Sequence, residues 1–336
     1  LAQLRRIGRQ FLLGGGLQVA LTVAAVVALL TLAGLLPLTE RVFLIPGQVN
    51  IGVLRVATDR VVLIDSGLDR RAGRKILELL RAYQFTLEAI LCTHGHSDHI
   101  GGNAFLHRTT QCRILAGPLE TPVICHPLIQ AVALFGGAPI SDLQNRLVMA
   151  DPSPAEAIRG DSITFGDLTI QFLPLPGHSI GQVGYLVDGV AFLADALFPK
   201  PVMEKHRMLY LYDPAQQKKT LEFLRTVKAR MFVGGHFPPA EQIDDLIREM
   251  DRHISQIILF LRKHLIVPQP IDRLVKETLG HFRVKQSGWA HFLYRSSVLG
   301  YLSAMKNAGE VDFKIMENLP VWYATGNTKF KTEPML

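Results

Sequence analysis

The sequence predicts an α/β fold in which two β-sheets lie between outer helices, a four-layer αβ/βα sandwich, followed by a small helical domain. Short runs of valine, isoleucine and leucine, bounded by glycine, proline or aspartate, recur in residues 42–65 and 162–193 and are typical of strands. An amphipathic segment, residues 71–83, follows the first group and is expected to cover a sheet. From residue 241 the apolar residues recur at helical spacing.

The order of these elements divides the 336 residues into an apolar leader (1–40), a sandwich domain (41–240) and a helical domain (241–336). Strands are expected at residues 42–45, 51–56, 60–65, 162–165, 168–173, 183–187 and 190–193. The last domain is expected to hold helices and one hairpin, at residues 246–265, 271–279, 290–307, 311–316 and 321–324.

The most informative motif follows a predicted apolar strand and reads Thr-His-Gly-His-Ser-Asp-His-Ile-Gly-Gly at residues 93–102. It places His94, His96, Asp98 and His99 within six consecutive positions. Imidazole nitrogen and carboxylate oxygen are ligands that suit zinc, iron or manganese. The motif therefore predicts a metal site with enough ligands for two ions.

Three later polar residues each follow an apolar run: His178, Asp195 and His236. Glycine or proline separates the run from His178 and from His236, whereas Asp195 follows its run directly. Such runs deliver a side chain to the edge of a sheet. A single histidine after glycine is more often a solvated turn residue. These three residues gain their meaning from the order in which they follow the first motif.

This ordered set resembles the signature of the metallo-β-lactamase-fold hydrolase superfamily, over about residues 41 to 240. The resemblance implies that His94, His96 and His178 bind one metal ion. It implies that Asp98, His99 and His236 bind a second ion. It also implies that the carboxylate of Asp195 bridges the two ions. Two zinc ions are the expected cofactors, with iron or manganese as alternatives, and hydrolysis is the implied reaction.

Other residues near this set receive expected roles. Asp98 is a candidate catalytic general base as well as a ligand. Asp65 is expected behind the first metal loop, where a carboxylate orients a ligating histidine; a turn-forming aspartate before glycine is the alternative. Lys205 and Tyr210, in a basic and aromatic loop after the bridging aspartate, are candidate substrate-binding residues.

The segment between the two halves, residues 103–160, is expected to shape the pocket and carries Glu120, His126 and Arg146 as polar candidates. His126 precedes proline outside any matching motif, and we interpret it as an ordinary loop histidine.

The substrate stays open at this point. The favoured interpretation is a dinuclear hydrolase of a small ester, thioester or lactone. A phosphodiesterase or single-strand ribonuclease is the alternative, and a sulfur dioxygenase with one iron ion is a third interpretation. A non-catalytic binding protein would be expected to lack a ligand, whereas every ligand position is filled.

The helical domain resembles the winged-helix appendage of some of these hydrolases, which implies a lid or a homodimer surface. Its basic residues could also contact the phosphates of RNA, although a basic helix face is usually only solvated. They are Arg273, Lys276, Arg283, Lys285 and Arg295. A small-molecule substrate remains the favoured partner.

Residues 11–38 contain almost only apolar residues and follow Arg5, Arg6 and Arg9. About 20 apolar residues can span a bilayer, and basic residues before them keep that end in the cytoplasm. This favours a membrane anchor with an extracytoplasmic catalytic domain; a signal peptide and a start-site artefact are alternatives. Three cysteines without a CxxC pair favour a reducing compartment, and hence the cytoplasm, instead. The net charge of +7 permits contact with nucleic acid or anionic membrane and requires neither.

Overall fold

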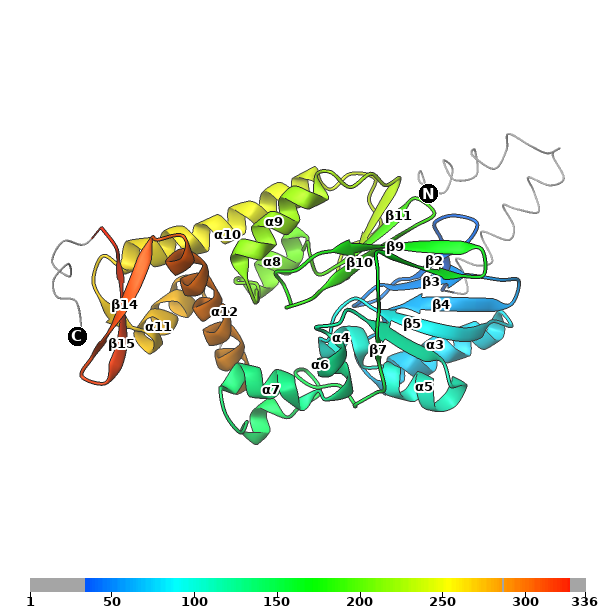
Figure 1. Ribbon diagram of the computed structural model, residues 1–336, viewed down its shortest axis with the longest axis horizontal. Helices are drawn as coiled ribbons and strands as arrows, with labels where there is room; N and C mark the ends of the chain where they lie inside the picture. The colour runs from blue at the N-terminus through cyan, green and yellow to red at the C-terminus, as the bar shows by residue number, and fades with distance from the viewer. Residues whose placement is uncertain (1–33, 286, 327–336) are drawn as a thin grey trace.

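The computed structural model describes residues 34–285 and 287–326. Two large sheets pack face to face, and helices lie on their outer sides (Figure 1). The predicted αβ/βα sandwich is therefore confirmed, and a helical region follows it toward the carboxyl end.

The first sheet begins as an antiparallel meander and continues with parallel strands. Its strands, in spatial order, are β1 (Leu36–Pro37), β2 (Val42–Ile45), β3 (Ile51–Arg55), β4 (Arg60–Ile64), β5 (Thr86–Cys92), β6 (Arg113–Ala116) and β7 (Glu156–Ala157). Most residues of β2 to β6 are buried, as expected for strands covered on both faces. Because β4 and β5 run parallel, the loops that follow them begin at the same edge of the sheet.

Helices α3 (Arg70–Ala82) and α5 (Asn103–Thr110) cover the outer face of this sheet. Helix α3 begins after Asp69, whose carboxylate accepts hydrogen bonds from the amides of Arg71 and Ala72, a favourable N-cap. Its buried side includes Ile76 and Leu80, which belong to the same apolar cluster as the sheet.

The second sheet is antiparallel except for one parallel pair of strands at one of its edges. Its strands, in spatial order, are β12 (Met231–Gly234), β11 (Val190–Ala194), β10 (Val183–Val187), β9 (Leu168–Pro174) and β8 (Ser162–Phe165). Tyr185 and Phe192 pack with Leu91 of the first sheet in one buried cluster between the sheets. Helices α8 (Lys200–His206) and α9 (Pro214–Leu224) follow β11 in the chain.

Short helix α4 (Ser97–Ile100) lies in the loop after β5. After β6, the segment between the two halves forms further short helices, namely α6 (Thr121–Cys125), α7 (Leu128–Phe135) and the 3₁₀ helix η1 (Ser141–Leu143). Helix α7 reaches the carboxyl-terminal region, where it contacts helix α12 (Gly288–Asn307).

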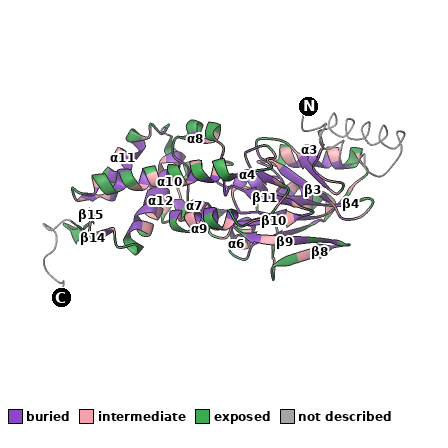
Figure 2. Cartoon of the chain, turned by 90° about the horizontal axis from the view of Figure 1, so that it is seen from above, coloured by how far each residue is buried: buried purple, intermediate pink, exposed green. Residues whose placement is uncertain are grey.

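The carboxyl-terminal region also contains α10 (Asp244–His264), α11 (Ile271–His281), β13 (Gln269–Pro270), β14 (Val311–Met316) and β15 (Leu319–Ala324). One apolar cluster runs from Leu193 of β11 through Leu221 of α9 to Ile254 of α10 and Leu302 of α12. Figure 2 shows buried residues along α9, α10 and α12. The predicted helices and hairpin are present, while the winged-helix resemblance and the boundary near residue 240 stay predictions.

The expected membrane anchor needs correction. Among residues 34–285 and 287–326, no helix combines the length and the apolar character needed to cross a bilayer. Most of the expected span, with its basic flank, falls on residues 1–33 and lies outside the described residues. The end of the span is wrong, because Leu35 is fully buried in the first sheet's apolar cluster and Leu36–Pro37 pair with β2. The predicted membrane-anchored placement of the catalytic domain outside the cytoplasm depended on this span and is corrected with it.

Candidate metal centre

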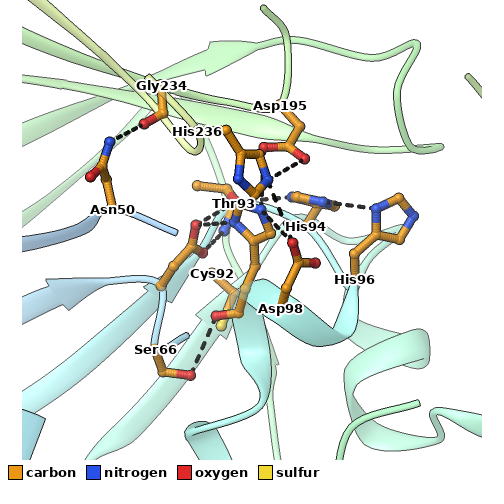
Figure 3. Close-up of polar contacts among 12 residues, drawn as sticks. Asn50, Ser66, Cys92, Thr93, His94, His96, Asp98, Asp195, Gly234 and His236 are labelled. Carbon is orange, nitrogen blue, oxygen red and sulfur yellow. Dashed lines mark hydrogen bonds and ion pairs between the residues drawn. The ribbon is translucent and has the colours of Figure 1, made fainter. Parts of the chain in front are cut away.

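The predicted ligand residues lie at one edge of the sandwich, in loops that follow four strands. The first motif connects β5 to α4, while His178 follows β9, Asp195 follows β11 and His236 follows β12. The structure brings the side chains of all seven together: His94, His96, Asp98, His99, His178, Asp195 and His236. Figure 3 shows five of them close to one another, His94, His96, Asp98, Asp195 and His236.

The first group consists of His94, His96 and His178, whose potential ligand atoms all lie within 4.8 Å of one another. His94 Nε2 is 3.0 Å from His96 Nδ1, and His178 Nε2 is 2.9 Å from the same atom. Three imidazole nitrogens that converge on one point are a typical arrangement around a divalent cation.

The second group consists of Asp98, His99 and His236, again within 4.8 Å of one another. Asp195 lies between the groups. Its Oδ2 is 3.5 Å from His178 Nε2 and 3.3 Å from His236 Nε2, and its Oδ1 is 3.2 Å from His99 Nε2. One carboxylate therefore faces both groups.

Two buried atoms test whether this site fits a cation. His99 Nε2 and Asp195 Oδ1 are both buried; although they lie 3.2 Å apart, their contact lacks the geometry of a hydrogen bond, and neither atom has another hydrogen-bond partner within the described part of the chain. Buried polar atoms are nearly always satisfied, and an imidazole nitrogen beside a carboxylate oxygen is the donor set of a divalent metal site. The residues present thus fit a bound metal ion.

The two groups differ in their electrostatics. Burial lowers the pKa of His94, His96 and His178, the last to about 3, so these imidazoles are neutral, the form that binds metal. Burial acts in the same direction on His99 and His236, but facing carboxylates, first that of Asp195, outweigh it. They raise the pKa of His99 well above its usual value and that of His236 to about 10.

Asp98 is partly exposed and its carboxylate is 3.5 Å from His236 Nε2. Burial alone would raise its pKa, but the charge of His99 and a hydrogen bond from His236 lower the pKa to about 2. The carboxylate is therefore ionised at neutral pH.

Asp65 lies directly behind the first ligand loop. Its carboxylate accepts hydrogen bonds from the amide and the hydroxyl of Thr93, each at 2.8 Å, and lies 2.7 Å from His99 Nδ1. Thr93 Oγ1 in turn lies 3.0 Å from His94 Nδ1. Asp65 adopts a φ of 64° at the end of β4, a left-handed conformation that aspartate tolerates better than most residues.

Glu120 connects two ligand loops, a role that sequence reasoning missed. Its side chain accepts hydrogen bonds from Gly95 N at 2.8 Å, Ser179 Oγ at 2.7 Å and Gly181 N at 2.7 Å. The residue is only 2% exposed. Its sequence position, in a turn before α6, gave no signal of these partners.

Main-chain carbonyls hold the later histidines. His178 Nδ1 lies 3.1 Å from the carbonyl oxygen of Tyr210, and His236 Nδ1 lies 2.7 Å from that of Gln48. A hydrogen bond at Nδ1 directs Nε2 toward the metal position.

The segment that presents the Tyr210 carbonyl is itself tied to the carboxyl-terminal helices. Leu209 N donates to His253 Nε2 of α10 and Leu211 N donates to Ser297 Oγ of α12, each at 3.2 Å. The carboxyl-terminal region therefore contacts the site through this segment.

Gly235 stands where a side chain has no room. A Cβ at this position would lie 2.4 Å from Asp195 Oδ1 and 2.9 Å from His99 Cε1. Glycine before His236 thus lets the β12 loop approach both ligand groups.

A cavity of about 1080 Å³ opens beside the site and is lined by five of the seven residues: His96, Asp98, His178, Asp195 and His236. Lys205 and Tyr210, the candidate substrate-binding residues, also line it. His126 instead lines a separate pocket, and Arg146 is 3.8 Å from Asp69.

Known proteins share this architecture. A metallo-beta-lactamase family protein from Thermus thermophilus covers 86% of this chain and 100% of its own, with a TM-score of 0.68 and 21% identity. A beta-lactamase domain protein from Burkholderia ambifaria covers 87% and 94%, with a TM-score of 0.68 and 19% identity. At these identities the likeness concerns the fold.

Closer sequence similarity covers a shorter stretch. A hydroxyacylglutathione hydrolase from Vibrio campbellii is 31% identical over 150 residues, 44% of this chain and 46% of that protein. One from Rhodopseudomonas palustris is 34% identical over 140 residues, 40% and 45% of the two chains. The matched stretch is thus under half the length of these relatives. The family model of the metallo-beta-lactamase superfamily matches residues 44–236, more than half of the sequence, and the chain belongs to this superfamily of metallohydrolases.

Proposed function

We propose that the protein is a metallohydrolase that uses two bound zinc ions to cleave an acyl thioester. The observation that carries the proposal is that seven ligand-type side chains converge beside the large cavity, with Asp195 between the two groups. The relatives named hydroxyacylglutathione hydrolases support a thioester as the bond that is cleaved. A divalent cation bound here would acidify water and polarise the carbonyl under attack.

The three neutral imidazoles of the first group and the three residues of the second would each hold one ion, and Asp195 would contact both. Asp98, ionised and facing the cavity, can accept a proton from water during attack. In the overall reaction the water oxygen bonds to the acyl carbon, the carbon–sulfur bond breaks, and the thiolate takes up a proton. The products are a carboxylic acid and a thiol.

The first test compares two substrates on the zinc-loaded full chain. An acyl-glutathione thioester and a labelled single-stranded RNA are incubated in parallel, each with and without chelator. We expect chelator-sensitive thioester cleavage and intact RNA. Chelator-sensitive RNA cleavage with an untouched thioester would overturn the proposal in favour of a nuclease.

A pair of histidine variants checks the site. His236→Ala should lower kcat/KM by at least about 100-fold, since it removes a ligand at the cavity. His126→Ala is the matched control, because His126 is exposed and lines another pocket, and it should keep the wild-type rate. Metal analysis should give two zinc ions per chain; one iron ion would favour the dioxygenase interpretation.

The ribonuclease alternative draws little support from the carboxyl-terminal region. Arg273 Nε lies 3.0 Å from Glu277, and Arg295 Nε lies 3.1 Å from Asp272. These pairs neutralise part of the basic face that would have to contact phosphates.

A further inference from the structure

The cavity beside the metal centre is larger than a small acyl group requires. Its volume, about 1080 Å³, lies just above the roughly 300–1,000 Å³ of small-molecule sites. Much of its wall away from the ligand residues is apolar, formed by Leu134 of α7, Leu147, Val148, and Trp289 and Leu293 of α12.

This apolar wall begins next to the metal ligands. The ring centroid of Tyr210 is 5.7 Å from that of His96 and 5.9 Å from that of His178. Tyr210, Trp289 and Leu293 all pack against the same buried apolar cluster, which includes Leu134. A substrate group that leaves the reacting carbon in this direction therefore meets carbon atoms rather than water.

Two separate parts of the chain build the wall together. Helices α7 and α12 lie against each other (Figures 1 and 2), and the rings of Phe135 and Phe292 are 5.2 Å apart at this contact. Leu147 is 49% exposed, and Trp289 and Leu293 are only partly buried. An apolar ligand group placed on them would remove further apolar surface from water, which favours binding.

Cationic side chains line other parts of the same cavity. Arg71 and Lys75 extend from the first turns of α3 and Lys205 from α8. All three are exposed, and within residues 34–285 and 287–326 none of them forms an ion pair. They are available to an anionic group of a ligand.

We infer that the substrates are thioesters of long apolar acyl groups on an anionic thiol. The acyl chain would lie along the wall between α7 and α12, and the anionic part of the thiol would contact Arg71, Lys75 or Lys205. This inference rests on the proposed thioester hydrolysis and adds the acyl class to it.

The test is a series of acetyl, butanoyl, hexanoyl and octanoyl thioesters of glutathione, assayed with the zinc-loaded full chain. We expect kcat/KM to rise about two- to fourfold with each added CH₂ until the wall is covered. A series that is flat or favours acetyl would overturn this inference and leave thioester hydrolysis standing. Failure to cleave any member would overturn the proposed function itself.

Variants of the wall sharpen the test. Leu293→Ser should lower kcat/KM for the octanoyl thioester about tenfold and leave the acetyl thioester unchanged. Leu299→Ser is the control, because Leu299 lies on the same helix but packs on the carboxyl-terminal core. Leu147→Ser, at a more exposed position, should reproduce the effect without risk to folding. An unchanged octanoyl-to-acetyl ratio in both wall variants would overturn the inference.

The role of the cationic side chains is tested by changing the charge of the thiol part of the substrate. Lys75→Gln should raise KM for octanoyl-glutathione several-fold and leave the uncharged octanoyl-N-acetylcysteamine unchanged. Arg74→Gln, an exposed neighbour that does not line the cavity, is the control. Equal effects on both thioesters would contradict recognition of an anionic thiol.

Discussion

The first ligand loop, residues 93–99, and the later ligand loops are held in place by different kinds of contact. The buried carboxylates of Asp65 and Glu120 hold the first loop. Main-chain carbonyls hold the imidazoles of His178 and His236, and Glu120 also binds the loop after His178 through Ser179 and Gly181. A single substitution can remove a carboxylate but not a carbonyl, so the orientation of His94 and His99 should be more sensitive to mutation of their supporting residues than that of His178 and His236.

The largest effect is expected for Asp65→Asn. Asparagine keeps the size of aspartate and tolerates the positive φ, but it removes the charge that faces Thr93 and His99. We expect zinc affinity to fall about 10- to 100-fold, measured by competition with a chelator of known affinity. Asp69→Asn is the control, since asparagine caps a helix as well as aspartate does. Equal zinc affinities for Asp65→Asn and wild type would remove the proposed role.

Glu120→Gln should have the next largest effect. Glutamine replaces one carboxylate oxygen by an amide NH₂, which then faces a main-chain N–H at Gly95 or Gly181. A buried donor without an acceptor costs about 1–3 kcal/mol. We expect lower stability in urea and a zinc affinity reduced about tenfold or less, with the exposed Glu78→Gln as control. A Glu120→Gln variant that lost activity but kept wild-type stability and zinc affinity would disprove the link between the two loops.

His253 offers a test of the carbonyl-held side through pH. Burial lowers its pKa from 6.5 to about 4, so below pH 6.5 the unfolded chain binds a proton that the folded chain does not. Its contribution to the free energy of unfolding therefore falls as pH drops from 6.5 toward 4, by up to about 3 kcal/mol.

His253→Gln keeps an acceptor for Leu209 N and removes this titration. Urea unfolding of the metal-free protein at pH 7, 6 and 5 should therefore show a smaller loss of stability in the variant than in the wild type. His126→Gln, at an exposed position, should lose as much stability as the wild type. Identical pH profiles for His253→Gln and wild type would refute the assignment.

The smallest effect is expected for Tyr210→Phe. The carbonyl of Tyr210, not its hydroxyl, contacts His178, so zinc affinity should stay within about twofold of wild type. The lost hydrogen bond to Ser296 should cost about 0.5–1.5 kcal/mol of stability. A tenfold drop in zinc affinity would show that the later ligands also depend on side chains.

Much of the fold follows from local pattern. Helix α3 was expected at residues 71–83 from its apolar spacing and spans Arg70–Ala82. Strands β2 to β4 and β8 to β11 were expected because buried strands form apolar runs between turn residues. Strands β1, β6 and β7 were not expected. The end of the leader was misplaced because hydropathy cannot distinguish a buried edge strand such as β1 from the last turn of an apolar helix.

The candidate site, too, was only partly predictable from the sequence. Its seven ligand-type residues could be predicted because their order in the sequence resembles the superfamily signature, and the structure places them after strands at one edge of the sandwich. The partners of Glu120 and of His236 could not, since Ser179 lies 59 positions from Glu120 and Gln48 lies 188 positions from His236. Such contacts arise only when the two sheets pack.

The hydrogen bonds of residues 209–211 also limit how chimeric proteins can be built from related enzymes. Two amides of this segment depend on acceptors at His253 and Ser297, while the carbonyl between them contacts His178. A chimera joined near residue 240 would inherit a metal site from one parent and its supporting acceptors from another. Grafted tails should therefore succeed only when they bring hydrogen-bond acceptors to those two positions.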